Sequence, residues 1–456
     1  MELASKKFVE IYKNLYLILF TLIVLFGRSL TGIYIFNYRL GELAIGACLV
    51  LSVFFLLFAK RSNKFFYFGD STYIFLKLIF ISFFITAFVT ESSFTDIYSY
   101  KRSSYIWTLS FLFLGMFAFK NLKVDSLFNK ILPALLPLTY ILSANYFPQF
   151  LSDFFIRYSD KFDFLKASDV FLIFVATNII NQKIIKKEFN YVIYLLLSSA
   201  IFIPLFLFKS KGAFLPAVLF LLFEVIRLRK TFLTQKVKSL LLIAFCIPLF
   251  YLSTYNIGLQ MFVNNYTLEE VDLSSQIVSS VSRASAQKNT VELFGSFFLM
   301  DGRLYSMEQM ANWRLQIWQD VTRDLFYESE YDGNDNINFF RIEGPAKEMK
   351  SPLFGFGYSE MFPAMNHSSR RGTDMKNENV HNFAVNILGK GGILQFSLFV
   401  GFYLSIISYW YKKNKNYRIL VFFTFALMTA FFDVAMESVR FPFIFFGTVA
   451  YLFNEN

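Results

Sequence analysis

The chain has few of the residues from which metal, redox and disulfide sites are built. Its 456 residues include two cysteines and two histidines. Both cysteines, Cys48 and Cys246, lie in apolar runs, so the simplest interpretation is that they pack as small apolar side chains. Neither a disulfide framework nor a zinc site can be built from this set. The sequence therefore predicts no metal centre.

Charge is also scarce. Charged residues make up 17% of the chain, against about 25% in ordinary soluble domains. Hydrophobic residues account for 55% and aromatic residues for 20%, and the mean hydropathy is +0.46. A soluble protein has no interior large enough to bury so much apolar surface. The composition therefore predicts an all-α membrane protein that crosses the bilayer many times.

Long apolar runs divide the chain into spans. A transmembrane helix needs roughly 20 mostly apolar residues. The first apolar run is too long for a signal peptide and ends in no cleavage site, so we take it as the first span. Twelve spans are predicted, at about 15–36, 41–59, 73–93, 104–119, 130–148, 168–182, 191–208, 213–228, 238–255, 392–411, 418–435 and 440–454.

The basic residues indicate an orientation. If the N-terminus is cytoplasmic, the inner segments hold 21 Lys and Arg, whereas the short outer loops hold nine. Positive charge resists translocation, so both termini are predicted to be cytoplasmic. The same asymmetry accounts for most of the net charge of +11 without a nucleic-acid partner. Membrane lipids are the expected surroundings.

One long polar segment interrupts the spans. Residues 256–380 are charged, and "SMEQMANWRLQIWQDVTRDLF" within them is typical of a helix. In this topology the segment lies outside the cytoplasm. We therefore expect spans one to nine in 1–255, a large and partly helical extracytoplasmic loop in 256–391, and spans ten to twelve in 392–456.

Lysines stand at the outer mouth of the eighth predicted span. Lys209 and Lys211 flank Ser210 and precede Gly212 in "FKSKGAF". Lysines at the end of a span commonly reach toward lipid headgroups. The alternative is an anion clamp, because the following helix N-terminus adds a positive dipole. Both interpretations stay open on these residues alone.

An arginine and a tryptophan share a face of the predicted loop helix. Arg314 and Trp318 are four residues apart in "MANWRLQIWQDV". A structural cation–π pair is one interpretation. The other is a phosphate-binding arginine, because the guanidinium fork suits a diphosphate better than an ammonium does.

The stretch "VHNFAVNILGKGG" places His381 and Asn382 just before the tenth span. A short helix here would align Val385 and Leu388 below His381, and the glycines would end or bend it. A lone histidine is usually structural. Histidine is also the side chain best matched to proton transfer near neutral pH.

Taken together, these stretches resemble the membrane family of O-antigen ligases, O-antigen polymerases and protein O-oligosaccharyltransferases. The resemblance covers roughly residues 200–410 and rests on four short motifs in the right order. They are Ser210-Lys211-Gly212, Arg314 with Trp318, the turn Pro352-Leu353-x-Gly355-x-Gly357, and His381-Asn382 followed by Val385, Leu388 and Gly392. Three departures are Lys211 in place of the usual arginine, Gln395 at a position where glycine is common, and an insertion over about 326–350.

The resemblance implies a reaction without metal or other cofactor. A glycan carried on undecaprenyl diphosphate is transferred, at the outer face of the bacterial inner membrane, to a hydroxyl on a lipid core, a glycan or a protein. His381 would be the base and Asn382 would orient it, while Arg314 and Lys211 would hold the diphosphate. Further candidates for glycan or phosphate contacts are Arg283, Arg303, Arg28 and Lys390.

Three functions compete. A ligase and a polymerase form the same bond and differ in the acceptor, which the sequence does not separate. A transporter or lipid-linked glycan flippase is the third, but transporters keep polar groups near the bilayer midplane. Here charge concentrates at the outer surface, which favours chemistry there over passage through the membrane.

Overall fold

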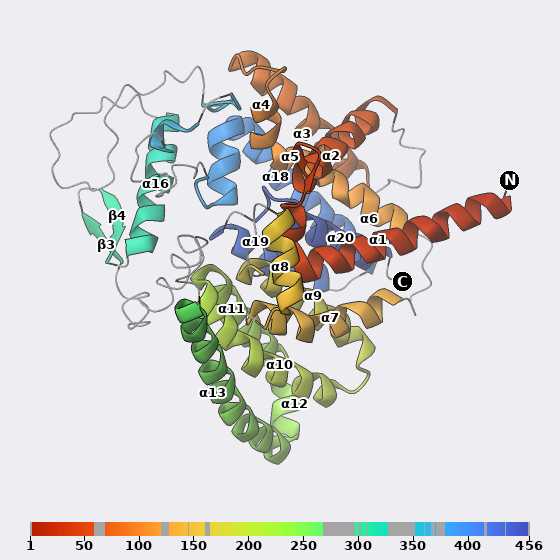
Figure 1. Ribbon diagram of the computed structural model, residues 1–456, viewed down its shortest axis with the longest axis vertical. Helices are drawn as coiled ribbons and strands as arrows, with labels where there is room; N and C mark the ends of the chain where they lie inside the picture. The colour runs from red at the N-terminus through yellow and green to blue at the C-terminus, as the bar shows by residue number, and fades with distance from the viewer. Residues whose placement is uncertain are drawn as a thin grey trace.

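The computed structural model describes most of the chain as helix (Figure 1). The described residues are 2–58, 69–119, 127–144, 146–159, 165–267, 297–300, 302–307, 309–326, 352–359, 361–365, 370, 379–414, 417–433 and 435–454. The all-α prediction is confirmed for them, apart from two short hairpins.

The principal helices follow the apolar runs. Their bounds are α1 Glu2–Thr31, α2 Leu40–Phe58, α3 Asp70–Val89, α6 Phe111–Phe119, α7 Leu127–Ser143, α9 Ala167–Ile184, α10 Glu188–Lys209, α11 Lys211–Arg227, α13 Lys236–Thr267, α18 Phe383–Asn414, α19 Arg418–Ala430 and α20 Arg440–Asn454.

Shorter elements connect these helices. They are α4 Ile97–Arg102, α5 Ser104–Trp107, η1 Thr108–Ser110, α8 Gln149–Tyr158, α12 Arg229–Thr234 and η2 Pro363–Met365, with the antiparallel hairpins β1 Tyr34–Ile35 with β2 Tyr38–Arg39, and β3 Phe297–Met300 with β4 Arg303–Ser306.

Six of the described helices are long and apolar enough to cross a membrane. They include most of α1, all of α2, α3 and α10, and large parts of α13 and α18, and three shorter apolar helices accompany them. The chain is therefore a membrane protein. A helix occupies each of the twelve predicted ranges, although bilayer crossing by all twelve stays a prediction.

The predicted loop helix is confirmed as α16, Gln309–Phe326. The β3–β4 hairpin, which the sequence analysis did not predict, packs against it. Both lie on the opposite side of the molecule from the N-terminal end of α1 (Figure 1).

The last helix forms the centre of the bundle. Every residue of α20 from Arg440 to Phe453 is buried. A helix that is apolar all round is typical of a position surrounded by other helices. The helices α6, α1 and α9 pack against it. The turn that leads into α20 is thereby anchored to a buried helix.

Helix α18 is broken near its start, as the glycines predicted. Gly392 has φ 67°, a value that L side chains rarely adopt. The Pro352-to-Gly357 turn fills the break, because Phe356 N donates to Gly389 O over 2.8 Å and Ile393 N donates to Pro352 O over 3.1 Å. Two motifs that are separate in sequence thus form one backbone-bonded unit.

The departure at Gln395 has a structural reason. Its side chain is buried in α18 and joins three other buried residues. Its Nε2 donates to Tyr358 Oη over 2.9 Å and to Ser82 Oγ over 3.1 Å, and its Oε1 accepts from Tyr105 Oη. Gln395 therefore ties α3, α5 and the 352–359 turn to α18.

Replacing Gln395 with leucine should destabilise the protein. The change removes three hydrogen bonds and leaves buried hydroxyls without them, which costs roughly 1–3 kcal/mol for each unsatisfied group. Thermal unfolding of the purified protein in detergent measures the effect. Ser397→Leu is the control, because Ser397 is exposed on the same helix. Equal melting temperatures for both variants would contradict the role given to Gln395.

Candidate functional site

Two tryptophans of α16, Trp313 and Trp318, hold the segment before α18. Trp318 Nε1 donates to Val380 O over 2.6 Å. The ring centroids of Trp313 and His381 lie 5.3 Å apart, with the planes tilted by 60°. The tryptophans thus fix both the backbone beside His381 and one face of its imidazole.

The backbone at His381 corrects one expectation. Helix α18 begins at Phe383, so His381 precedes it and does not share a helical face with Val385 and Leu388. Asn382 caps the helix, because its Oδ1 accepts from Val385 N over 3.1 Å. His381 has φ 54°, a left-handed conformation that is uncommon outside glycine and of a kind that clusters at functional sites.

Arg314 joins the same helix to the turn between α19 and α20. Its Nη1 donates to Phe432 O over 2.6 Å. Phe432 also contacts the start of α11, where a Cβ on Gly212 would lie 2.7 Å from Phe432 Cβ. Only glycine permits this approach without a shift. Arg314 and the Ser210-Lys211-Gly212 motif therefore meet at Phe432.

Asp433 is the carboxylate at this meeting point. Its Oδ2 accepts from Ser168 Oγ over 2.8 Å, and its Oδ1 lies 3.8 Å from Lys166 Nζ. Burial opposes ionisation, but the positive charges of Lys166 and Arg314, the Ser168 hydroxyl and His381 together hold the pKa of Asp433 well below its ordinary value. Asp433 is thus a carboxylate at neutral pH, close to both cations and the imidazole.

The structure places Lys211 at the start of its helix and Arg28 near the end of its helix. Lys211 is the first residue of α11 and is half-buried. Arg28 follows a kink at Gly27 in the last turn of α1. A Cβ on Gly27 would lie 3.5 Å from Arg440 Cδ, and Arg440 pairs with Asp169 over 3.4 Å. Both predicted cations thus stand beside segments that border Asp433.

Lys390 lies in a neighbouring cluster. Its side chain is buried, and its Nζ donates to Arg102 O over 2.9 Å. Glu437 follows Asp433 by four residues and is close to both Lys390 and Arg102. Burial raises the pKa of Glu437, and the charges of Lys390 and Arg102 act against that rise.

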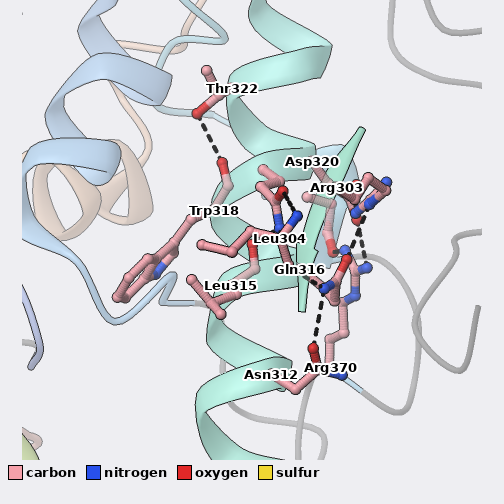
Figure 2. Close-up of polar contacts among 11 residues, drawn as sticks. Arg303, Leu304, Asn312, Leu315, Gln316, Trp318, Asp320, Thr322 and Arg370 are labelled. Carbon is pink, nitrogen blue, oxygen red and sulfur yellow. Dashed lines mark hydrogen bonds and ion pairs between the residues drawn. The ribbon is translucent and has the colours of Figure 1, made fainter. Parts of the chain in front are cut away.

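Arg303 lies elsewhere, in a network that joins the β3–β4 hairpin to α16 (Figure 2). Its Nη2 pairs with Asp320 Oδ1 over 2.6 Å, and its Nε donates to Gln316 Oε1 over 3.0 Å. Arg370 Nη2 binds the other oxygen of Asp320 over 2.5 Å. These contacts account for Arg303 as a structural residue, and its contact with a glycan stays a prediction.

Two further predictions lie outside the described residues. Arg283 belongs to the stretch 268–296, and the expected insertion falls almost wholly in 327–350. Their roles stay predictions.

The sequence alone did not single out five residues of these clusters, which are Asp433, Lys166, Ser168, Arg102 and Glu437. One signal was available. Carboxylates in apolar stretches at the ends of spans are rare and commonly functional, and "AFFDVAMESVRF" carries two of them, one at the end of predicted span eleven and one between spans eleven and twelve. What the sequence could not give was their partners, which come from other helices.

The arrangement combines an imidazole, an ionised carboxylate and a group of cations. An imidazole can accept a proton from a hydroxyl, and a nearby carboxylate can orient it and stabilise its charged form. Arginine and lysine can neutralise a phosphate leaving group. Among the described residues, no group of three or more His, Cys, Asp or Glu is placed to hold a metal ion.

Asp433→Asn should remove a pH-dependent part of the stability. Because folding lowers the pKa of Asp433 from its ordinary value of 3.8, the carboxylate stabilises the native state fully above that pH, and this effect is lost progressively as the pH falls from there toward the lower pKa of the folded state. The free energy of unfolding of the wild type should exceed that of the variant by roughly 1–3 kcal/mol at pH 7. The two free energies should converge in acid.

Chemical unfolding between pH 7 and 3, followed by tryptophan fluorescence, measures the difference. Asp153→Asn is the control, because Asp153 is exposed on α8. Parallel stability curves for wild type and Asp433→Asn would show that the Asp433 contacts contribute nothing.

No protein-family model matches the chain, and a search of curated proteins finds no significant match.

Proposed function

We propose that the protein is a metal-independent glycosyltransferase that moves a glycan from undecaprenyl diphosphate to an acceptor hydroxyl. One observation carries the proposal. Three segments that bear the family-like motifs, around Lys211, Arg314 and His381, converge on the Phe432–Asp433 turn. They are far apart in sequence, and their convergence is what a reaction with one base and several phosphate-binding cations requires.

The roles follow from the chemistry. The acceptor oxygen attacks the anomeric carbon of the donor sugar, and the bond from that carbon to the diphosphate oxygen breaks. His381 takes the hydroxyl proton, and Asp433 stabilises the imidazolium that forms. Arg314 and Lys211, joined by Lys166, hold the departing diphosphate, whose charge increases as the bond breaks.

The proposed setting is the bacterial inner membrane, with twelve spans and both termini in the cytoplasm. The site then faces the periplasm, where a lipid-linked donor presents its diphosphate at the membrane surface. The single-sided distribution of Lys and Arg in the loops supports this orientation.

The acceptor distinguishes the two forms of the proposal. We take a lipid-core or similar acceptor, as for a ligase, as the main form and a lipid-linked glycan, as for a polymerase, as the alternative. Deleting a ligase leaves polymerised glycan on the undecaprenyl carrier, whereas deleting a polymerase leaves single repeat units on the acceptor. Analysis of the lipid-linked glycan in a deletion strain separates them.

His381→Asn should abolish transfer while the protein still folds. Asparagine tolerates the left-handed conformation at this position, so it removes the base with little backbone strain. We expect a loss of about 100-fold or more in turnover, within the range of general-base catalysis. The measurement uses purified enzyme with lipid-linked donor and acceptor, and circular dichroism checks the fold. Near-normal turnover would exclude His381 as the base.

Arg314→Lys should recover little of the activity lost in Arg314→Ala. Lysine keeps the charge but loses the planar fork that bonds a diphosphate and the Phe432 carbonyl together. The expected loss is about tenfold to a hundredfold in kcat/KM for both variants. Arg323→Ala is the control, because Arg323 is exposed near the end of the same helix. Full activity in Arg314→Lys would show that Arg314 contributes only its positive charge and not its planar fork.

A further inference from the structure

Arg102, the last residue of α4, is buried, and the two terminal nitrogens of its guanidinium make no hydrogen bond to the described residues. Only 6% of the surface of Arg102 is exposed. Its two terminal nitrogens, Nη1 and Nη2, are buried and bond to none of the residues that the structure describes. Buried arginines are almost always paired. The in-plane donors of this guanidinium are therefore available to a ligand.

A second cation stands beside it. Lys390 is 3% exposed, and its Nζ donates to the Arg102 carbonyl over 2.9 Å. The half-buried Glu437 is the acidic group near the pair, and its main chain is fixed by Ser104 Oγ, which donates to Glu437 O over 2.9 Å. The charges of Lys390 and Arg102 act on Glu437 more strongly than those of Asp433 and Lys166 do.

Aromatic rings hold both cations in place. The centre of the Arg102 guanidinium lies 5.1 Å from the Tyr98 ring and 5.6 Å from the Phe362 ring. Lys390 Nζ lies 5.9 Å from the same Phe362 ring and 5.7 Å from the Tyr105 ring. Ring faces attract a cation, but they do not replace the strong acceptors that a guanidinium edge binds. The rings thus orient the pair and leave the hydrogen-bonding edge of Arg102 unused.

We propose that Arg102 and Lys390 form a binding site for an oxyanion, a phosphate or carboxylate group carried by a substrate or a lipid. The guanidinium fork matches two oxygens of such a group, and the ammonium adds a point charge. Phe362 covers both cations, so its ring shifts when the anion binds. Glu437 fixes the orientation by repelling the anion from its own side.

This site centres on different residues from the one at Asp433, and the two are neighbours, because Asp433 and Lys166 also act on Glu437. Asp433 and its cations centre on Phe432, whereas Arg102 and Lys390 centre on Phe362 and Glu437. The inference does not depend on glycosyl transfer, because it concerns binding alone. If the transferase proposal holds, the second site would receive an acidic group of the acceptor or of the glycan.

Binding of inorganic phosphate tests the site in the full-length protein. The protein is placed in nanodiscs of phosphatidylcholine, and its melting temperature is followed by tryptophan fluorescence as phosphate is added at constant ionic strength. Arg102→Gln removes the fork. Lys101→Gln removes the same charge from the adjacent, exposed residue. We expect phosphate to stabilise wild type and Lys101→Gln, and to bind Arg102→Gln about tenfold or more weakly.

A second arm identifies the source of the anion. Nanodiscs with phosphatidylglycerol replace the neutral ones, without added phosphate. Stabilisation by the anionic lipid that depends on Arg102 assigns the site to a headgroup, whereas stabilisation by phosphate in neutral discs assigns it to a soluble or substrate-borne group. Either result supports the site.

Two controls keep the test decisive. Repeating the phosphate titration in Arg314→Lys should leave the Arg102-dependent part unchanged, which separates the two sites. If Arg102→Gln does not yield monodisperse protein, Arg102→Lys replaces it, because lysine keeps the charge and loses the fork. Equal responses of the Arg102 variant and Lys101→Gln in both kinds of disc, including no response at all, would overturn the proposal.

Discussion

The hydrogen bond from Arg314 Nη1 to the Phe432 carbonyl is the contact on which the candidate site depends. It joins α16 to the turn between two helices of the bundle. That turn leads into α20, which is buried over its length. A charge-assisted bond to a backbone carbonyl is stronger than a neutral one. A polar helix is thereby held in register with a rigid part of the bundle.

Once α16 is held there, the rest of the site follows. Its tryptophans position Val380 and His381, and the glycine break of α18 fixes the helix that follows. Asp433, next to Phe432, then lies among charges supplied by two other segments. Preorganised charges of this kind are the largest contribution to many enzymatic rate enhancements. The proposed chemistry thus rests on packing in the bundle as much as on the residues that react.

Two clusters of charge lie along the turn between α19 and α20. Asp433 and Glu437 are four residues apart, and each is surrounded by cations from different helices. Buried charges are costly unless they are paired. Their retention at this depth is therefore an argument for function at both clusters. Separate clusters also suit a reaction with two bulky substrates, because each substrate then has its own cationic contact.

The sequence by itself determined the membrane class, the helical ranges and the break at Gly392, because hydropathy and glycine conformation act locally. It also singled out His381, Arg314 and Lys211. Only the tertiary structure decided that Asp433 and Lys166 lie beside them, that Arg102 lies with Lys390, and that Arg303 pairs with Asp320 instead. The physical reason is that the pairing of a buried charge is a long-range property. It depends on which helix ends meet, and no local pattern encodes that meeting.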